Sequence, residues 1–564
     1  MASLYPKKVN GKTYWYLRQM ARVDGKPKMV SERYLGSAED IEAAMAGSVA
    51  VPERTRHLAF GAVAAGWTVL TRLRVAEIVD EVVGPRRADA GASVGTYLAL
   101  AALNRLVDPC SRRSLADWWT ATAADRFTSI HAGVLDHRRF WDATRTVTTE
   151  HLAEIERRVV AEMIATYGLD ISAVALDMTN FATYIDSSND KASLAQRGKA
   201  KQKRADLRLV GLGLVITRDG GIPLLSHTYP GNRPDVTQFP LMLTELCARY
   251  TAYTTTAQVP GQVTVVFDAG QNSTANFADL RAAQIGYVTS LPPSDHADLL
   301  ALPKRSRRRV DQDRFPGLTA LQRRKTIYGQ DTRVILTHSP TLHAGQARGL
   351  DQTLTKTEAR LTELADRLAR GKTRRDKTAV AAEIRGICKD TWVKRTLTWN
   401  LTGDTPAELS LTWNIDEHAR AALEEEIFGK RILVTNHDDW PIADVVTAYR
   451  SQSDAEFGFR QLKDPHAVSF SPMNHFTDQA IRVHTYTCVL ALQLAHLMRR
   501  QAHQAGLHLS VRALADALAG IGETVMIYPS AGGRPKARRM LTETTTDQNH
   551  LIELFDLHQW APRT

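Results

Sequence analysis

Residues 441–464, PIADVVTAYRSQSDAEFGFRQLKD, place polar and charged side chains on a helix face that begins apolar. Gln452, Glu456 and Lys463 follow Tyr449 at offsets of 3, 7 and 14 residues. At about 100° per residue these positions fall within roughly 60° of arc, so a single helix through the segment presents all four on one face. The apolar start of the face predicts that it is buried. A carboxylate on such a face needs a partner.

Two apolar segments upstream each carry one aspartate. Asp177 ends the run AVALD, and Asp268 ends the run VTVVFD. Short runs of β-branched and other apolar residues are typical of strands buried in a sheet. An ionised carboxylate at the end of such a strand is costly unless it binds something. Together with Glu456, the sequence therefore contains three acidic side chains that each need a binding partner.

Two strand aspartates and a helix glutamate are a suitable ligand set for a pair of magnesium ions. Carboxylate oxygens suit Mg²⁺, and two ions held together stabilise both the attacking and the leaving oxygen of a phosphodiester. Asp177, Asp268 and Glu456 are therefore the candidate catalytic residues and metal ligands. Two Mg²⁺ ions are the expected cofactor, with Mn²⁺ as a substitute. The leading hypothesis is metal-dependent phosphoryl transfer on nucleic acid.

The ordered set of motifs resembles that of the DDE transposases of bacterial insertion sequences, the cut-and-paste group with an RNase H-like catalytic domain. Tyr449, Glu456 and Lys463 match the Tyr-x2-Arg-x3-Glu-x6-Lys signature of these proteins. Asp177 in ALDMTNF and Asp268 in VVFDAGQNS resemble the first and second carboxylates of the family. Three motifs in order are far more specific than any one of them.

One position departs from the signature, because Gln452 stands where the family has arginine. The family's arginine contacts DNA phosphate near the cleavage site, and Arg460, four residues after Glu456, is the candidate to replace it. Lys463 is the candidate to neutralise a phosphate as a point charge, with a surface salt bridge as the alternative. Tyr449 either stacks or hydrogen-bonds at the cleavage site, or belongs to the core.

The resemblance covers roughly residues 172–494 and has implications for activity and partners. It implies a transposase that binds the inverted-repeat ends of its element, cleaves them and joins the freed 3′-OH ends to target DNA. Double-stranded DNA is the implied partner, a homodimer the implied assembly on DNA, and the bacterial cytoplasm, at the nucleoid, the implied location. A transposase-derived DNA-binding protein without catalysis and a standalone RNase H-like nuclease remain alternatives.

The composition is that of a globular protein with a basic bias. Lys and Arg number 72 against 61 Asp and Glu, a formal net charge of +11. This favours a polyanionic partner but is weak support by itself. The four cysteines form no C-x-x-C pair, so neither a zinc site nor a disulfide framework is indicated. No membrane segment and no nucleotide-binding glycine motif is found, so neither a membrane partner nor a nucleotide cofactor is expected.

The sequence predicts an α/β protein whose RNase H-like, mixed-sheet core carries a large insertion and follows a β-hairpin unit and a helical domain. The predicted boundaries are 1–50 for the β-rich unit, 51–170 for the helical DNA-binding domain, 171–294 and 441–505 for the core, 295–440 for the insertion and 506–564 for the C-terminal region. A tight hairpin is expected at Asp24-Gly25. The helical domain either recognises DNA ends or only braces the core.

The resemblance also predicts how the core strands are arranged. Three strands, a helix, a strand, a helix and a fifth strand are expected in that order from residue 172 onward. The first and fourth strands should lie side by side, so that Asp177 and Asp268 meet. Asp235, which opens the helix after the third strand, is predicted to cap that helix.

A basic run opens the predicted insertion. It comprises Lys304, Arg305, Arg307, Arg308 and Arg309. The family has a strand-rich insertion at this point that helps to hold DNA, so these residues are candidate DNA contacts. A solvated basic face is the alternative. The strand-like segments WVKRTLTWN and LSLTWNI carry Trp392, Trp399 and Trp413, which either stack on a flipped base or occupy buried strand positions.

Overall fold

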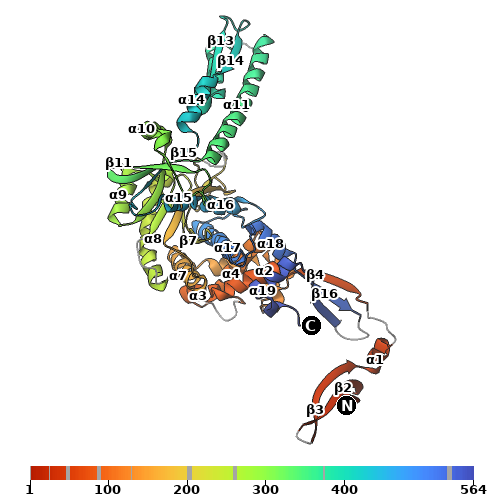
Figure 1. Ribbon diagram of the computed structural model, residues 1–564. Helices are drawn as coiled ribbons and strands as arrows, with labels where there is room; N and C mark the ends of the chain where they lie inside the picture. Colours follow the sequence, from red (N-terminus) through yellow and green to blue (C-terminus); the bar gives the residue numbers. More distant parts are fainter. Residues whose placement is uncertain are drawn as a thin grey trace. The chain divides into compact units, whose positions relative to one another are not determined.

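The computed structural model of the chain describes residues 2–23, 26–45, 51–85, 91–128, 130–199, 206–257, 263–371, 375–529 and 536–563. The chain divides into two compact units, and Figure 1 labels many of their helices and strands. The smaller comprises Met1–Ala65, Trp119–Ser129 and Ala515–Thr564, and the larger comprises Gly66–Trp118 and Ile130–Leu514. The three acidic positions predicted to form the site all lie in the larger unit.

A mixed nine-stranded sheet forms the centre of the larger unit, in the order β10-β11-β12-β15-β9-β8-β5-β6-β7. The strands are β5 (Ala173–Ala182), β6 (Leu209–Thr217), β7 (Pro223–Pro230), β8 (Thr264–Phe267), β9 (Gly286–Leu291), β10 (Arg308–Arg309), β11 (Thr319–Ile327), β12 (Gln330–His338) and β15 (Lys430–Thr435). β5 pairs with β8 in parallel and with β6 antiparallel, and β8 pairs with β9 in parallel. The chain is thus a mixed α/β protein with one large sheet.

The strand order predicted for residues 172 onward is confirmed. Three strands are followed by α8 (Asp235–Ala257), β8, α9 (Thr274–Ala282) and β9, and the first and fourth strands of this series, β5 and β8, are neighbours. All nine residues of β6 are buried, as expected for a central strand covered on both faces. Two glycines in β6 allow this packing, because a Cβ at Gly211 would lie 2.2 Å from the Tyr229 ring and one at Gly213 would lie 2.3 Å from Met242 Sδ.

Residues 441–464 form two consecutive helices, where the sequence predicted one. They are α15 (Ile442–Arg450) and α16 (Gln452–Lys463), with Ser451 between them. The Ser451 hydroxyl donates a 2.6 Å hydrogen bond to the carbonyl of Ala448, a side-chain bond that competes with the backbone ladder of a helix. The backbone of Ser451 keeps helical angles, φ −63° and ψ −16°, so the chain continues from α15 into α16 with little change of path.

The range predicted as an insertion, 295–440, divides into two parts. β10, β11, β12 and β15 continue the central sheet beyond β9. The remainder consists of α11 (Pro340–Ala369), α12 (Lys377–Ile387), α13 (Thr391–Thr396), β13 (Leu397–Thr402), β14 (Ser410–Ile415) and α14 (Glu417–Ile427). These elements share a separate apolar core built on leucines of α11, and Figure 1 shows α11, α14 and the β13–β14 hairpin side by side.

Two details of that part differ from the sequence prediction. The segment WVKRT is helical, because Asp390 accepts hydrogen bonds from the backbone N–H groups of Trp392 and Val393 and so caps α13. Trp399 and Trp413 are directly paired across the β13–β14 hairpin and, with Trp392, pack against its core while staying partly exposed.

Helices from the range 51–170 pack against the core helices within the larger unit. They include α3 (Val75–Val83), α4 (Val94–Val107), α6 (His137–Thr144) and α7 (Thr149–Tyr167). α4 and α7 both contact α17 (Asp478–Gln504), and α7 also contacts α8 and β7. α3 and α4 approach closely at Gly95, where a Cβ would lie 2.0 Å from the carbonyl oxygen of Ala76. These helices therefore brace the core, while their predicted DNA contact stays a prediction.

The smaller unit contains two three-stranded antiparallel sheets. β1 (Ala2–Val9), β2 (Lys12–Val23) and β3 (Lys26–Gly36) form one, and β4 (Arg54–Ala59), β16 (Gly522–Tyr528) and β17 (Lys536–Leu541) form the other. The predicted hairpin residues Asp24-Gly25 lie outside the described residues. A second tight turn, not predicted, joins β1 to β2 at Asn10-Gly11, both with positive φ. Part of the predicted C-terminal region thus pairs with a strand near the N-terminus.

The remaining helices are short. They are α1 (Ala38–Met45), α2 (Gly61–Arg72), α5 (Leu115–Thr120), α10 (Ala297–Leu300), α18 (Val511–Ala519) and α19 (Thr546–Leu554). Among the helices of the described residues, none combines the length and the apolar character needed to cross a membrane.

Candidate functional site

Asp177 and Asp268 occupy equivalent positions on two neighbouring parallel strands. Leu176 of β5 is in register with Phe267 of β8, and the two aspartates are the next residues along the two strands. Parallel strands lie about 5 Å apart, and residues in register point to the same face of the sheet. Asp177 is half-buried, whereas Asp268 is exposed because β8 ends at Phe267. The sheet therefore brings together two carboxylates that lie far apart in the sequence.

Helix α16, which carries Glu456, packs against β5 and β6. The contact is fixed at the end of the helix, where Lys463 Nζ donates a 2.7 Å hydrogen bond to Thr179 Oγ1. Thr179 lies two residues after Asp177 in β5 and therefore on the same face of the sheet. The predicted burial of Glu456 is wrong, since its side chain is exposed. The helix buries other positions instead, among them Ala455 and Leu462.

Tyr449 connects the helix pair to the second aspartate. Its hydroxyl donates a 3.0 Å hydrogen bond to Ser290 Oγ, and Ser290 Oγ donates a longer bond, 3.5 Å, to Asp268 Oδ1. Burial raises the pKa of Tyr449, and the charges of Asp268 and Glu456 raise it further against the lowering effects of Ser290 and Arg431. The phenol therefore stays protonated near neutral pH, and both carboxylates are near enough to act on it.

A second tyrosine lies beside the first aspartate. Tyr229, in β7, donates a 2.8 Å hydrogen bond from its hydroxyl to Asp235 Oδ1. Burial raises its pKa above the usual value, and the charges of Asp235 and Asp177 raise it further. Asp235 is the first residue within α8, so its predicted role as the cap that precedes the helix stays a prediction; its carboxylate accepts the hydrogen bond from Tyr229. No sequence pattern pointed to Tyr229 or Ser290 beyond a polar residue near the end of a buried strand.

Gln452 occupies the position at which the family signature has an arginine. Gln452 is the first residue of α16 and is buried. Arg460 is exposed, with its guanidinium 5.8 Å from the centroid of the Phe457 ring. Arg431, an exposed residue of β15 that the sequence did not indicate, has its guanidinium 5.0 Å from the ring centroid of Tyr449. Arg431 is thus a cation next to the tyrosine that contacts Ser290.

The carboxylate oxygens of Asp177, Asp268 and Glu456 suit a hard cation, although the three side chains do not surround a common point. Within the described residues, no three His, Cys, Asp or Glu side chains form a metal-binding group. In the same part of the chain, neither Asp268 nor Glu456 forms an ion pair, and both are exposed. Carboxylate oxygens on rigid strands and on a helix packed against them are the ligands that Mg²⁺ prefers.

Residues 170–494 match the family model described as "Transposase DDE domain", and this range is more than half of the chain. The chain belongs to this family. The match covers nearly the same residues as the resemblance seen in the motifs, and family membership implies an enzyme of the transposase type. It does not single out a bacterial insertion-sequence group.

Two further comparisons were made. Curated proteins provide no match to the chain. Among solved structures, the chain is similar to the cryo-EM structure of a piggyBac transposase synaptic complex with hairpin DNA, at 8% identity and a TM-score of 0.36, over 83% of this chain and 82% of that chain. A TM-score of this size does not establish a shared fold.

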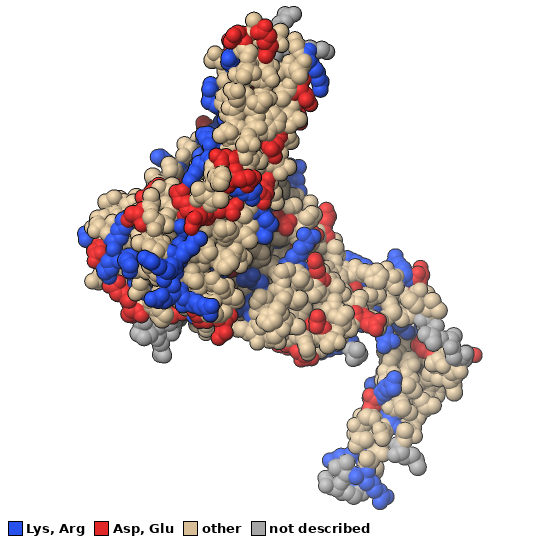
Figure 2. All heavy atoms as spheres, turned by 45° about the horizontal axis from the view of Figure 1, so that its top comes forward, with Lys and Arg blue, Asp and Glu red and all other residues tan. Residues whose placement is uncertain are grey.

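The basic run of this DDE-family chain is divided between exposed and paired side chains. Arg305 and Arg308 are exposed, whereas Lys304, also exposed, lies 3.2 Å from the Glu425 carboxylate. Arg307 is only 9% exposed, and burial lowers the pKa of its guanidinium. The predicted DNA contacts are therefore not one continuous exposed surface. Figure 2 shows Lys and Arg side chains gathered on one face of the larger unit, beside a group of Asp and Glu.

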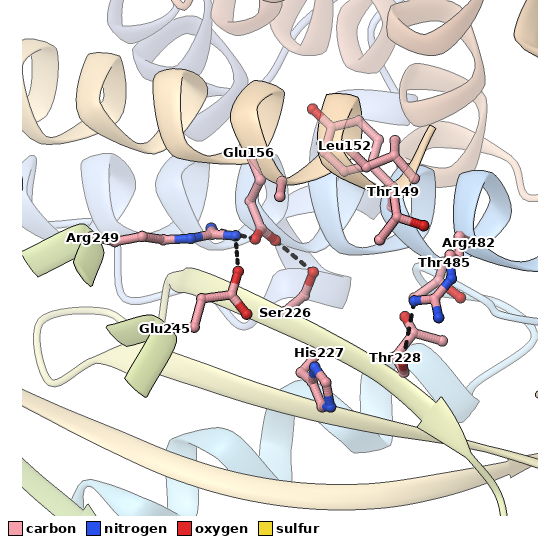
Figure 3. A pocket seen from close by; sticks show the side chains of 12 residues that line it. Thr149, Leu152, Glu156, Ser226, His227, Thr228, Glu245, Arg249, Arg482 and Thr485 are labelled. Atoms are coloured by element: carbon pink, nitrogen blue, oxygen red, sulfur yellow. Dashed lines mark hydrogen bonds and ion pairs between the residues drawn. The ribbon is translucent and has the colours of Figure 1, made fainter. Parts of the chain in front are cut away.

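Another group of acids, drawn in Figure 3, lines a small cavity of about 100 Å³ between α7, β7, α8 and α17. Here Glu156 binds Arg249 at 2.6 Å and accepts a 2.5 Å hydrogen bond from Ser226, and Arg249 also pairs with Glu245. Burial lowers the pKa of the nearby His227. The charged groups satisfy one another, so this cavity is a buried ion network that joins α7 to α8.

Proposed function

We propose that the chain is a DNA transposase that cleaves the ends of its mobile element and joins the 3′-OH ends to target DNA in an RNase H-like catalytic core. One observation carries this proposal. Asp177 and Asp268 stand at equivalent positions of the neighbouring parallel strands β5 and β8, and the helix with Glu456 packs against β5. The family match supports the reaction class.

Asp177, Asp268 and Glu456 would hold the divalent ions, Mg²⁺ with Mn²⁺ as a substitute. Bound ions supply Lewis-acid stabilisation of the attacking and leaving oxygens of the phosphodiester. Tyr449, through Ser290, fixes the orientation of the Asp268 carboxylate. The rest of the reaction depends on how the chain positions the phosphate and excludes other nucleophiles.

Two cations position the DNA strand. Lys463, held by Thr179 on the strand of Asp177, offers an ammonium group beside the carboxylates. Arg431 supplies the charge that the family signature places at the position of Gln452, because its guanidinium lies against Tyr449. An arginine suits this role since its planar fork binds two phosphate oxygens at once. Arg460, which lies over Phe457, is the alternative from the same helix as Glu456.

Double-stranded DNA, both as inverted-repeat ends and as target, is the partner of this proposed enzyme, and a homodimer would pair two ends. The net charge of +11 supports a polyanionic partner. The exposed Arg305 and Arg308 are proposed to contact the DNA backbone, whereas the buried Arg307 is better suited to a structural role.

The test uses labelled element-end DNA with Mg²⁺ and three variants of the full chain. Asp177→Asn and Glu456→Gln keep side-chain size and remove a charge, and Asp279→Asn, at an exposed position of α9, is the matched control. We expect end-specific cleavage and strand transfer by the wild type and by the control, and neither by the two site variants. Cleavage without preference for element ends would favour a nuclease, and binding without cleavage would favour a DNA-binding derivative.

A further inference from the structure

A second and larger cavity lies in the larger unit, bounded by α4, α6, α17 and residues 472–475, with a volume of about 500 Å³. Three arginines line it, and two of them are buried: Arg105 from α4 and Arg112 from the segment between α4 and α5. The side chains of Trp141, His475 and His484 also line the cavity. None of these residues belongs to the carboxylate site, and no motif of the sequence pointed to them.

Both arginines are buried, and both have donors that lack acceptors. Arg105 is 1% exposed and donates from Nη1 to the carbonyls of Ser469 and Ser471, at 3.0 and 2.9 Å. Arg112 is 6% exposed and donates from Nη2 to Thr487 Oγ1 at 3.1 Å. Within the described residues, Arg105 Nε and Arg112 Nε and Nη1 are buried without a hydrogen-bond partner.

The two guanidinium groups have no carboxylate to balance them. In the described part of the chain, neither arginine forms an ion pair with Asp or Glu. Burial lowers the pKa of Arg112 to about 9, and the charge of Arg105 adds to this effect. Arginine holds its proton under ordinary conditions, so two adjacent buried cations are strongly disfavoured unless an anion joins them.

Two of the histidines that line the cavity, His475 and His484, are neutral and leave polar atoms unused. Burial, with Arg112 and Arg105, lowers the pKa of His475 to about 3, and burial also takes the pKa of His484 well below its usual value. His475 Nε2 and His484 Nδ1 are buried and, among the described residues, have no hydrogen-bond partner. His484 Nε2 donates to the carbonyl of Phe470 at 2.8 Å, so Nδ1 of this neutral ring is an acceptor. The neutral ring of His475 can donate from Nε2 without adding charge.

We propose that this cavity binds a phosphate group. A phosphate carries the negative charge that the arginine pair lacks and has several acceptor oxygens, which match the unused guanidinium donors. The cavity exceeds the size of a single phosphate, so the group arrives as part of a larger molecule or with water. A DNA strand and a free phosphate compound are the two sources of this chemistry.

The cavity is linked to the end of the helix that carries the proposed site. Arg105 holds the carbonyls of Ser469 and Ser471, and the residue between them, Phe470, stacks on Phe181 of β5 at 4.1 Å between ring centroids. Lys463 Nζ lies 5.3 Å from the same Phe181 ring. A phosphate in the cavity would therefore stabilise the segment that follows α16. This role differs from that of the three carboxylates and does not depend on them.

The binding test measures inorganic phosphate on the full chain by isothermal titration calorimetry, with chloride at equal ionic strength as the control. We expect saturable binding by the wild type and at least about tenfold weaker binding by Arg112→Gln, because a charge-assisted hydrogen bond is lost. The matched control is Arg281→Gln, which removes an exposed arginine of α9 that does not line the cavity and should bind like the wild type. Absence of binding by the wild type, or equal binding by Arg112→Gln, overturns the proposal.

A second variant keeps the test informative if Arg112→Gln does not fold. Asn474 lines the cavity and is exposed, so Asn474→Asp adds a negative charge at the edge without disturbing the core. It should weaken phosphate binding by about tenfold, while Asn474→Ser should not. Equal binding by both Asn474 variants and the wild type would count against the proposal.

The source of the phosphate is decided by a short DNA duplex and a mononucleotide, each titrated against wild type and Arg112→Gln. Weaker binding of the duplex to the variant, with the mononucleotide unaffected, identifies a DNA strand as the source. The reverse pattern identifies a free phosphate compound. Duplex and mononucleotide binding that are both unchanged in the variant would show that the cavity takes neither, and the proposal would fail.

Discussion

Two groups of acidic residues in the larger unit differ in how their charges are balanced. In the cavity of Figure 3, Glu156 is 3% exposed and forms a short ion pair with Arg249, which also binds Glu245. At the edge of the sheet, Asp268 and Glu456 are exposed and, within the described residues, form no ion pair. Buried acids with partners hold helices together, whereas exposed acids on rigid elements are available to bind a cation.

Two buried arginines differ in the same way, because the pKa of one is raised and the pKa of the other is lowered. Burial lowers the pKa of Arg249, but the charges of Glu156, Tyr253 and Glu245 raise it above the usual value. Burial and Arg105 lower the pKa of Arg112, and no carboxylate opposes them. A buried charge that the chain itself neutralises is structural, and one that it leaves unbalanced indicates a ligand.

The largest expected effect is the loss of DNA cleavage in Asp177→Asn. The change removes one of the three proposed cation ligands, so we expect cleavage to fall by about three orders of magnitude or more. The thermal unfolding midpoint should stay close to that of the wild type, since asparagine has the size of aspartate and keeps an oxygen that can accept from the backbone N–H of Met178. Cleavage rates and calorimetric scans on the same preparation provide the measurement. Normal cleavage by this variant would remove the distinction between the two acidic groups.

Glu156→Gln should show the opposite pattern. It leaves Arg249 buried and only partly compensated, and breaking a buried pair typically costs about 3–5 kcal/mol of stability. Urea unfolding measures the loss, with Glu150→Gln, an exposed glutamate of the same helix, as the control that should unfold like the wild type. Cleavage per folded molecule should be unchanged. A stable Glu156 variant with reduced cleavage would mean that the two groups have been assigned to the wrong roles.

Arg431→Gln should have a smaller effect, confined to activity. Loss of the guanidinium beside Tyr449 should reduce cleavage by about tenfold to a hundredfold, because a charged hydrogen bond to phosphate is removed. Arg460→Gln, assayed in parallel, decides between the two candidates for the missing signature arginine. A larger loss in the Arg460 variant would assign the phosphate contact to α16 and not to β15.

The smallest expected effect is that of Tyr449→Phe. The change removes only the hydroxyl that binds Ser290, so a decrease in cleavage of about fivefold to tenfold is expected. Ser290→Ala should give a similar decrease, and the double variant should be no worse than either single one, because both act on Asp268 through one chain of hydrogen bonds. Additive losses would show that Tyr449 acts on DNA directly.

Local patterns in the sequence were enough to predict the strands, and the family resemblance predicted the pairing of β5 with β8. Buried strands have continuous apolar runs, and Asp177 and Asp268 interrupt them at recognisable places. The exposure of Glu456 was mispredicted because α16 buries a different face, which includes Ala455 and Leu462. The sequence did not indicate that β10, β11, β12 and β15 join the same sheet, since pairing between strands that are distant in the chain leaves no local pattern.

The residues that sequence reasoning missed depend on contacts between distant segments. Arg431 lies 18 residues before Tyr449 and on a different element, and the contact of their side chains depends on the packing of α15 against β15. Arg105 binds a carbonyl 364 residues away. Periodicity and spacing describe single elements, so they cannot identify a cavity whose walls come from three of them.

The account depends most on the three carboxylates sharing divalent ions when DNA is bound. Anomalous diffraction from Mn²⁺ in crystals of the full chain with element-end DNA measures this directly. We predict Mn²⁺ peaks within about 2–2.5 Å of oxygens of Asp177, Asp268 and Glu456. Strong Mn²⁺ peaks elsewhere on the chain, with none between these three side chains, would contradict the account.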